Sequence, residues 1–260
     1  MKPSVLIVGY GIVGRNMHKL IPWADDVDAV QAVEKEIKDA GFWVDPEKLY
    51  DHALICVQTP SLPDGSCDTQ FVRKAVMGVQ ARNIIIKSAV PPGTADALTA
   101  ETGKNIVVSP EYFGETHHAN GVDQGFVIFG GDPQDTAAAA QLFQYVYTGA
   151  VKFFFVDAKT AELVKYMENT YLATKVVFCN EFYRIARAIG VEYGALRELF
   201  VADSRVNPSH TFVYESAPFF DSKCLNKDVP AIVNFAKSVG VYPTMLEAGR
   251  QRNAEFKVGE

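Results

Sequence analysis

The residues Ser4-Val-Leu-Ile-Val8 run directly into Gly9-Tyr-Gly11-Ile-Val-Gly14, and a helical pattern follows from Ile12 to Leu20. The apolar, mostly β-branched run is typical of a buried parallel strand. Gly9 permits a tight turn, Gly11 lets the backbone approach a pyrophosphate, and Gly14 lets the helix pack closely on the strand. The helix N-terminus offers N–H groups and a partial positive charge to phosphates. A purely structural turn is the alternative, but the flanking strand and helix favour a dinucleotide site formed by Gly9, Tyr10, Gly11, Ile12, Val13 and Gly14.

Strand-like and helical segments alternate through the rest of the first half. Alternation of this kind builds a parallel, doubly wound sheet that binds ligands at the carboxyl ends of its strands. The predicted strands are residues 53–57, 83–86, 105–108, 126–129 and 151–156, and helices are predicted at 71–80 and 135–146.

The second half is predicted to be helical. From Thr160 to about Ile189 there is no proline or glycine and apolar residues recur at helical spacing, so one long helix is expected. A loop is expected at 203–222, followed by helices from about 229 to 238 and from about 243. We therefore predict an α/β fold. A Rossmann-like doubly wound NAD-binding domain at 1–157 is followed by a long connecting helix and a small all-helical domain at 158–260.

Composition narrows the classes of function. The chain has 260 residues, 48% of them hydrophobic, and a net charge of −6, so it has no general attraction for nucleic acid or an anionic membrane. It contains no run of about 18 apolar residues that could span a bilayer. A strand is expected from Ser4, directly after Met1-Lys2-Pro3, so we expect no secretory signal. Its four scattered cysteines form no CxxC pair, which argues against a zinc site and a disulfide framework. We expect a cytoplasmic protein without a metal site.

The choice between NAD and NADP stays open. An acidic residue that binds the ribose is expected about 20 residues after the glycine motif. Asp25, Asp26 and Asp28 lie nearest, but the sequence around them is a poor strand. The absence of an arginine there favours NAD.

A candidate nucleophile lies near the end of the chain, in Cys224-Leu-Asn-Lys227-Asp228. Cations such as Lys223 and Lys227 favour the reactive thiolate form of a neighbouring cysteine. Together with a dinucleotide site, a thiol suggests oxidation of an aldehyde through a thioester. The alternative is a structural cysteine, which is the interpretation that we give to Cys56, Cys67 and Cys179. Lys165 and Asn169 share one helix face, although a solvated lysine and a neutral asparagine are the usual fates of such residues.

Together these motifs resemble the UDP-glucose/GDP-mannose 6-dehydrogenase family over nearly the whole chain, from Val5 to about Asn253. The helix motif and the Cys-x-x-Lys-Asp motif in series are specific, whereas GxGxxG alone is not. The motifs that occur in the family's order are Gly9–Gly14, Val57–Pro60, Lys87–Pro91, Pro110–Glu115, Ala161–Asn169, Asn180–Glu181 and Cys224–Asp228.

The resemblance implies oxidation of the C6 alcohol of a nucleotide sugar to a carboxylate, with two NAD and one water. It implies that Cys224 adds to the aldehyde, that Lys165 and Asn169 stabilise the oxyanion, and that Asp228 helps to activate water. Glu111 would assist proton transfer or thioester hydrolysis. The residues expected at the cofactor, besides the glycine motif, are Thr59, Pro60, Glu115 and Lys227.

Several positions depart from the family pattern. Ala89 replaces a threonine expected to hold the catalytic water, and Asp221 replaces a glycine beside the expected diphosphate site. Family members also continue for about another domain beyond the length of this chain. We therefore expect a truncated member, whose substrate is smaller, whose site is completed by a second chain, or whose full reaction is lost. A single hydride transfer, as in β-hydroxyacid dehydrogenases, and a degenerate non-catalytic NAD-binding protein are the alternatives. A homodimer is expected, because about 100 residues after the sheet are too few to bury a separate core well.

Overall fold

The computed structural model describes residues 2–24, 49–113, 125–147 and 149–259, which divide into two compact units. Unit 1 comprises Met1–Leu62 and Cys67–Lys165, and unit 2 comprises Pro63–Ser66 and Tyr166–Glu260. This division falls inside a helix, and the domain boundary at residue 157 stays a prediction.

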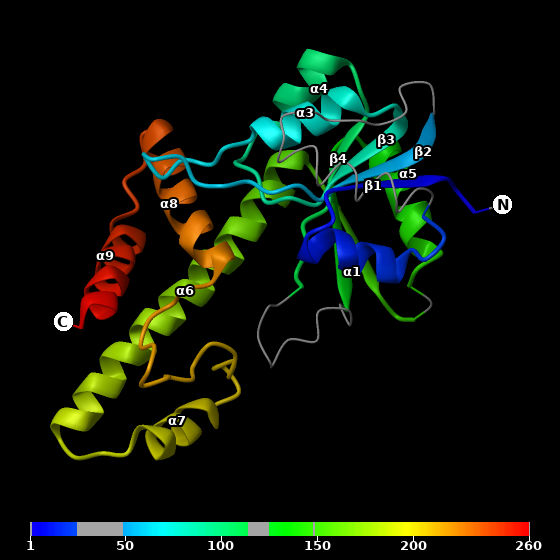
Figure 1. Ribbon diagram of the computed structural model, residues 1–260. Helices are drawn as coiled ribbons and strands as arrows, with labels where there is room; N and C mark the ends of the chain where they lie inside the picture. Colours follow the sequence, from blue (N-terminus) through cyan, green and yellow to red (C-terminus); the bar gives the residue numbers. More distant parts are fainter. Residues whose placement is uncertain (1, 25–48, 114–124, 148, 260) are drawn as a thin grey trace. The chain divides into compact units, whose positions relative to one another are not determined.

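Unit 1 is a sheet covered by helices on both faces. In Figure 1, α3 and α4 lie above the sheet, and α1 and α5 lie below it. The elements are β1 (Val5–Val8), α1 (Ile12–Leu20), β2 (Tyr50–Ile55), α3 (Gln70–Gly78), β3 (Ala81–Ile86), α4 (Thr94–Thr102), β4 (Ile106–Val108), β5 (Phe126–Gly130), α5 (Pro133–Gln144) and β6 (Lys152–Val156).

The six described strands lie in the order β1-β2-β3-β4-β5-β6. All pairs are parallel except β4 with β5, which meet antiparallel at Val108 and Gly130. The central strands are apolar on both faces, and Ile84, Ile85 and Ile86 of β3 are fully buried. Burial on both faces is what a sheet between two helix layers requires. The predicted Rossmann-like α/β sheet is confirmed.

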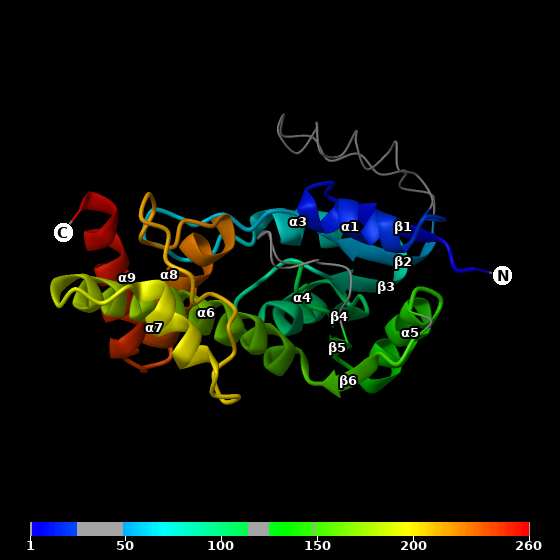
Figure 2. The same cartoon turned by 90° about the horizontal axis from the view of Figure 1, so that it is seen from below.

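Unit 2 is helical, as predicted. Its helices are the part of α6 (Ala158–Ala188) from Tyr166 onward, α7 (Tyr193–Val201), α8 (Lys223–Ser238) and α9 (Thr244–Val258). Both views place α8 and α9 beside α6 (Figure 1, Figure 2). Their contact is a small apolar core of Ala173, Val177, Phe220, Leu225, Val229 and Phe256.

A four-residue loop from early in the chain, Pro63–Ser66, belongs to unit 2. The Asn234 side-chain amide of α8 donates a 2.6 Å hydrogen bond to the Asp64 carbonyl. Gly65 has a φ of +84°, and a Cβ there would lie 3.1 Å from both Pro230 and Asn234. This loop therefore needs glycine both for its backbone conformation and for its close approach to α8.

Two helices differ from the sequence-based expectation. The helix expected from residue 229 begins at Lys223, because the Ser222 side chain caps it by accepting from the Leu225 N–H at 3.2 Å. Pro230 lies inside α8 rather than in its first turn. The short helix α4 was not predicted, since only Ala95 and Leu98 of its nine residues are buried.

None of the described helices combines the length and apolar character needed to cross a membrane. Within the same described residues, no group of His, Cys, Asp and Glu side chains is arranged to hold a metal ion. The cytoplasmic location stays a prediction.

Candidate active site

The β1–α1 turn has the shape that a dinucleotide pyrophosphate requires. Gly9 has a φ of +93°, and a Cβ there would lie 2.7 Å from the Cys56 carbonyl oxygen. A Cβ on Gly14 would lie 1.9 Å from the Gly9 carbonyl oxygen, so these two glycines fit the turn to the sheet and the helix. Gly11 is different, because a Cβ there would meet no described atom within 4 Å. The open space at Gly11 leaves room for a ligand against the backbone.

The N-terminus of α1 suits an anion. Its N-cap is Gly11, which has no side chain to bond the first N–H groups, and its first turn contains no acidic residue. Those N–H groups can therefore bind phosphate oxygens. Tyr10 lies beside α1, with its hydroxyl 2.8 Å from His18 Nδ1, while Ile12 is exposed.

The other residues predicted at the cofactor lie in different places. Thr59 is buried after β2, and the Pro60 carbonyl accepts a 2.8 Å hydrogen bond from the Asp68 N–H. Lys227 lies in unit 2, where it pairs with an aspartate. Glu115 and the aspartates considered for the ribose lie outside the described residues.

A buried lysine joins the loops that follow β3 and β4. Lys87 is 4% exposed, and its ammonium lies 3.2 Å from Ser109 Oγ and 3.5 Å from the Pro110 carbonyl oxygen. Burial and, to a smaller extent, the positive charge of Lys165 together lower the pKa of Lys87 to about 8, against the opposing effects of Cys56 and Glu111. Burial also raises the pKa of Cys56 to about 12, so that thiol is inert. Lys87 begins one of the motifs shared with the family, but its burial depends on long-range packing that no local pattern reveals.

The loop after β4 also contacts Lys165 of α6. The Lys165 ammonium lies 4.6 Å from the centre of the Tyr112 ring, within the range of a cation–π interaction. Next to Tyr112, the Glu111 carboxylate accepts a 2.5 Å hydrogen bond from the Phe113 N–H. Unit 1 thus brings together the Glu111 loop and Lys165, two of the predicted catalytic positions.

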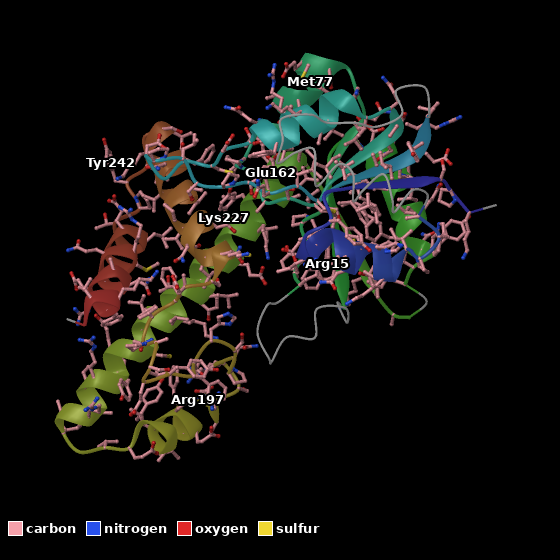
Figure 3. All side chains as sticks on the ribbon, in the orientation of Figure 1. Arg15, Met77, Glu162, Arg197, Lys227 and Tyr242 are labelled. Atoms are coloured by element: carbon pink, nitrogen blue, oxygen red, sulfur yellow. The ribbon has the colours of Figure 1, made fainter. Side chains whose placement is uncertain are left out.

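One turn before Lys165 is a residue that the sequence analysis missed. Glu162 is 2% exposed, and its carboxylate accepts hydrogen bonds from the N–H groups of Gly93 at 2.5 Å and Ala95 at 2.8 Å (Figure 3). Burial raises the pKa of Glu162 to about 7, although the two hydrogen bonds act to lower it. The charge of Asp96 has a smaller raising effect, and that of Lys159 a smaller lowering effect. The spacing of Glu162 and Lys165, three apart on one helix face, was the available signal.

In unit 2, three residues predicted at the catalytic or cofactor site are linked by hydrogen bonds. Asn169 Nδ2 donates to Asp228 Oδ2 at 2.6 Å, and Lys227 Nζ donates to Asp228 Oδ1 at 2.6 Å. Asn169 and Asp228 are almost fully buried, whereas Lys227, also marked in Figure 3, is partly exposed. Each carboxylate oxygen can accept a further hydrogen bond, because it has two lone pairs.

Cys224 is the second residue of α8 and is partly exposed. It therefore lies in the first turn of a capped helix, where the partial positive charge favours a thiolate. The prediction placed this helix terminus about six residues later, at about residue 229. Asp221, the unexpected carboxylate, forms an ion pair with Lys257 and accepts a 2.8 Å hydrogen bond from Asn226. Asp221 is thus neutralised by its neighbours.

The chain matches two domains of one enzyme family. Residues 43–149 match the NAD binding domain of the UDP-glucose/GDP-mannose dehydrogenase family, and residues 159–255 match its central domain. The UDP-N-acetyl-D-mannosamine dehydrogenase of Methanocaldococcus jannaschii is 32% identical over 215 residues, which are 78% of this chain and 48% of that protein. The chain spans about half the length of the curated relatives that it matches.

Two solved structures are similar in fold. A UDP-glucose dehydrogenase from the archaeon Pyrobaculum islandicum superposes with a TM-score of 0.79 at 22% identity, covering 98% of this chain and 68% of that one. The 3-hydroxyisobutyrate dehydrogenase of Mycobacterium tuberculosis superposes with a TM-score of 0.69 at 17% identity, covering 100% and 95%. Both likenesses support a Rossmann-type dehydrogenase fold. On the matched domains, this chain belongs to the UDP-glucose/GDP-mannose dehydrogenase family.

Proposed function

We propose that the protein is an NAD-dependent dehydrogenase that oxidises the C6 alcohol of a UDP-glucose- or GDP-mannose-like nucleotide sugar towards the acid. Membership of the family and the names of the relatives support the substrate class. The observation that carries the proposed chemistry is the position of Cys224, in the first turn of α8 and four residues before the buried Asp228.

The β1–α1 turn is the proposed cofactor site. The open space at Gly11 and the uncapped N-terminus of α1 fit a pyrophosphate. The match to the family's NAD binding domain covers residues 43–149, which follow this turn in the sequence. Thr59, Pro60 and Glu115 would contribute further contacts, and Lys227 would do so from α8. Bound there, NAD would accept hydride from the carbon being oxidised.

Cys224 would carry the covalent step. Its thiolate adds to the C6 aldehyde carbon and gives a hemithioacetal, whose loss of hydride leaves a thioester. Hydrolysis of the thioester consumes one water, releases the carboxylate and regenerates the thiol. Each hydride that leaves reduces one NAD, so the complete reaction gives two NADH for each substrate.

The remaining catalytic positions would stabilise charge and move protons. Lys165 and Asn169, one turn apart on α6, would stabilise the negative charge that develops on the substrate oxygen. Asn169 donates one N–H to Asp228 and has a second to offer. Asp228 would help to activate the hydrolytic water, and Glu111 would assist proton transfer.

We also propose a homodimer. One face of α6 carries Met167, Tyr171, Phe178, Phe182 and Ile185, which recur at helical spacing and are between 42% and 71% exposed. A continuous apolar stripe of this kind is unusual on a monomer and suits a second copy packed about a two-fold axis.

Stoichiometry tests the proposed reaction. The protein is incubated with NAD and a panel of nucleotide sugars, and the NADH formed for each substrate consumed is measured. Two NADH are expected for the unmodified protein and no more than one for Cys224→Ser. Cys67→Ser is the matched control, because Cys67 is also partly exposed but has no proposed role. One NADH from the unmodified protein would favour a single hydride transfer, and none with any sugar would favour a non-catalytic NAD-binding protein.

A further inference from the structure

Glu162 makes a contact that is unusual for a buried glutamate. Its two carboxylate oxygens accept from Ala95 and Gly93, the N–H groups at the start of α4. A carboxylate at a helix N-terminus is stabilised by the helix dipole, but an exposed position would give that benefit at a smaller desolvation cost. Asp96 and Lys159, whose charges act on Glu162 in opposite directions, pair with each other at 3.2 Å. Burial at this position therefore calls for a reason beyond capping.

The same chain offers an exposed counterpart. Glu192 accepts from the N–H groups of Gly194 and Ala195, both at 2.7 Å, at the start of α7. Glu192 is exposed, and those two hydrogen bonds lower its pKa. Both glutamates thus accept from two N–H groups at the start of a helix, but Glu192 is the exposed N-cap of its own helix, whereas Glu162 is buried and joins α6 to α4.

The contacts around Glu162 close into a ring within unit 1. Its partner Gly93 ends the loop that begins at Lys87, and Lys87 contacts the loop after β4 through Ser109 and Pro110. Tyr112 of that second loop faces the Lys165 ammonium, which is one helical turn from Glu162. The loops after β3 and β4 and the start of α6 are therefore held by one another.

Glu162 adds a constraint that packing alone does not supply. Ala161 packs so closely on β5 that a Cβ on Gly130 would lie 2.4 Å from the Ala161 Cβ, which limits the distance between α6 and β5. Small side chains in contact permit rotation of a helix about its own axis. The two directional hydrogen bonds of Glu162 oppose that rotation, which would move Lys165 away from Tyr112.

We propose that Glu162 is a positioning residue for Lys165, which it holds against the Tyr112 loop by joining the first turns of α6 to the start of α4. The inference rests on the proposed function only where it gives Lys165 a role in the reaction. The geometric part concerns the accessibility of one amine and can be tested without a substrate.

Limiting acetylation of lysines, followed by peptide mapping, measures that accessibility. Lys165 is 9% exposed and is expected to react slowly compared with the exposed Lys152 on β6, which serves as the internal reference. In Glu162→Gln the rate at Lys165 relative to Lys152 should rise about tenfold, because local opening follows the loss of directional hydrogen bonds. Glu162→Asp keeps the charge one methylene shorter, and its rate should lie between the two.

Glu192→Gln is the matched control, since it changes a glutamate that accepts from a helix N-terminus but leaves the contacts around Glu162 unchanged. It should leave the rate at Lys165 unchanged, even if both glutamine variants lose similar thermal stability. Urea unfolding confirms that each variant is folded before it is labelled. Equal rates at Lys165 in the unmodified protein and Glu162→Gln, or an equal rise in Glu192→Gln, would overturn the inference.

Turnover supplies the second arm of the experiment. If the proposed function holds, Glu162→Gln should lower kcat by about 10- to 100-fold, while KM and the NAD affinity stay unchanged, because a misplaced group weakens the transition state alone. An unchanged kcat together with exposed Lys165 would contradict the catalytic half of the inference. Absence of turnover in the unmodified protein would count against the proposed function, and the labelling result would still decide the role of Glu162.

Discussion

Asn169 of α6 donates a 2.6 Å hydrogen bond to Asp228 of α8, and both side chains are almost fully buried. The two positions are 59 residues apart in the sequence. Two residues with proposed catalytic roles are therefore also structural partners. A change at either one alters folding as well as chemistry, so the two effects have to be separated.

Asn169→Asp should destabilise the protein by about 3–5 kcal/mol at pH 7, because it leaves two carboxylates buried against each other. Lys227 compensates only one of these charges. The midpoint of urea unfolding measures the loss. The double variant Asn169→Asp/Asp228→Asn exchanges the amide and the carboxylate and should recover most of the stability. If the exchange recovers nothing, the hydrogen bond is not what couples the two positions.

Gly11→Val should abolish NAD binding and leave the fold intact, since a side chain there meets open space in the protein and would occupy the place of the pyrophosphate. Titration calorimetry with NAD measures the binding. Gly249→Val, in open space on α9, is the control and should bind NAD normally. Gly14→Ala should instead impair folding, because its Cβ would overlap the Gly9 carbonyl oxygen. Normal affinity in a folded Gly11→Val protein would remove the proposed site.

Limiting iodoacetamide should alkylate Cys224 before the other three cysteines. Cys224 is partly exposed at a helix N-terminus, whereas Cys56 and Cys179 are buried and burial raises the pKa of Cys56 to about 12. Cys67 is the informative competitor because it is also partly exposed. Peptide mapping gives the order of modification, and faster reaction at Cys67 would indicate an ordinary thiol at Cys224.

The stability of the unmodified protein should fall between about pH 5 and pH 8 relative to that of Glu162→Gln. Burial raises the pKa of Glu162 in the folded protein from 4.5 to about 7, so its contribution is complete below the unfolded pKa and is lost as the pH rises through 7. The full change is on the order of 3 kcal/mol. Urea unfolding of both proteins at several pH values checks this. A constant difference between them would mean that Glu162 does not titrate in this range.

Phe182→Glu should convert a dimer to a monomer, because it places a charge in the exposed apolar stripe of α6. Light scattering at micromolar concentration reports the mass. Met77→Glu is the control, since Met77 is a similarly exposed apolar residue on α3 of unit 1 and is not part of the stripe. A monomer in the unmodified protein would refute the proposed assembly.

Local patterns predicted the parts of the fold that depend on local physics. The β1–α1 turn and the bounds of α1 follow from glycine conformation and apolar spacing, and Ile12–Leu20 was predicted to the residue. The predicted start of α8 at about residue 229 was wrong, because the Ser222 side chain caps the helix and it begins at Lys223.

The site was harder to predict than the fold. The motifs named Lys165, Asn169 and Asp228, but the pairing of Asn169 with Asp228 depends on how α8 packs against α6. Glu162 was missed as a site residue, and the burial of Lys87 was not predicted, because both depend on loops brought together from distant positions. A glutamate in a helix has the same local pattern whether it faces water or the start of another helix.

The loop Pro63–Ser66 bears on the order in which the protein can be made. Asp64 and Asn234 are 170 residues apart, so this loop emerges from the ribosome long before its partner helix exists. Contacts of such wide sequence separation form late and slow the folding of a chain. Unit 2 cannot be completed until α8 has been synthesised, although its first residues are translated well before that helix. For the same reason, no single cut in the chain yields both units whole, and a fragment that ends inside α6 would present this loop without Asn234.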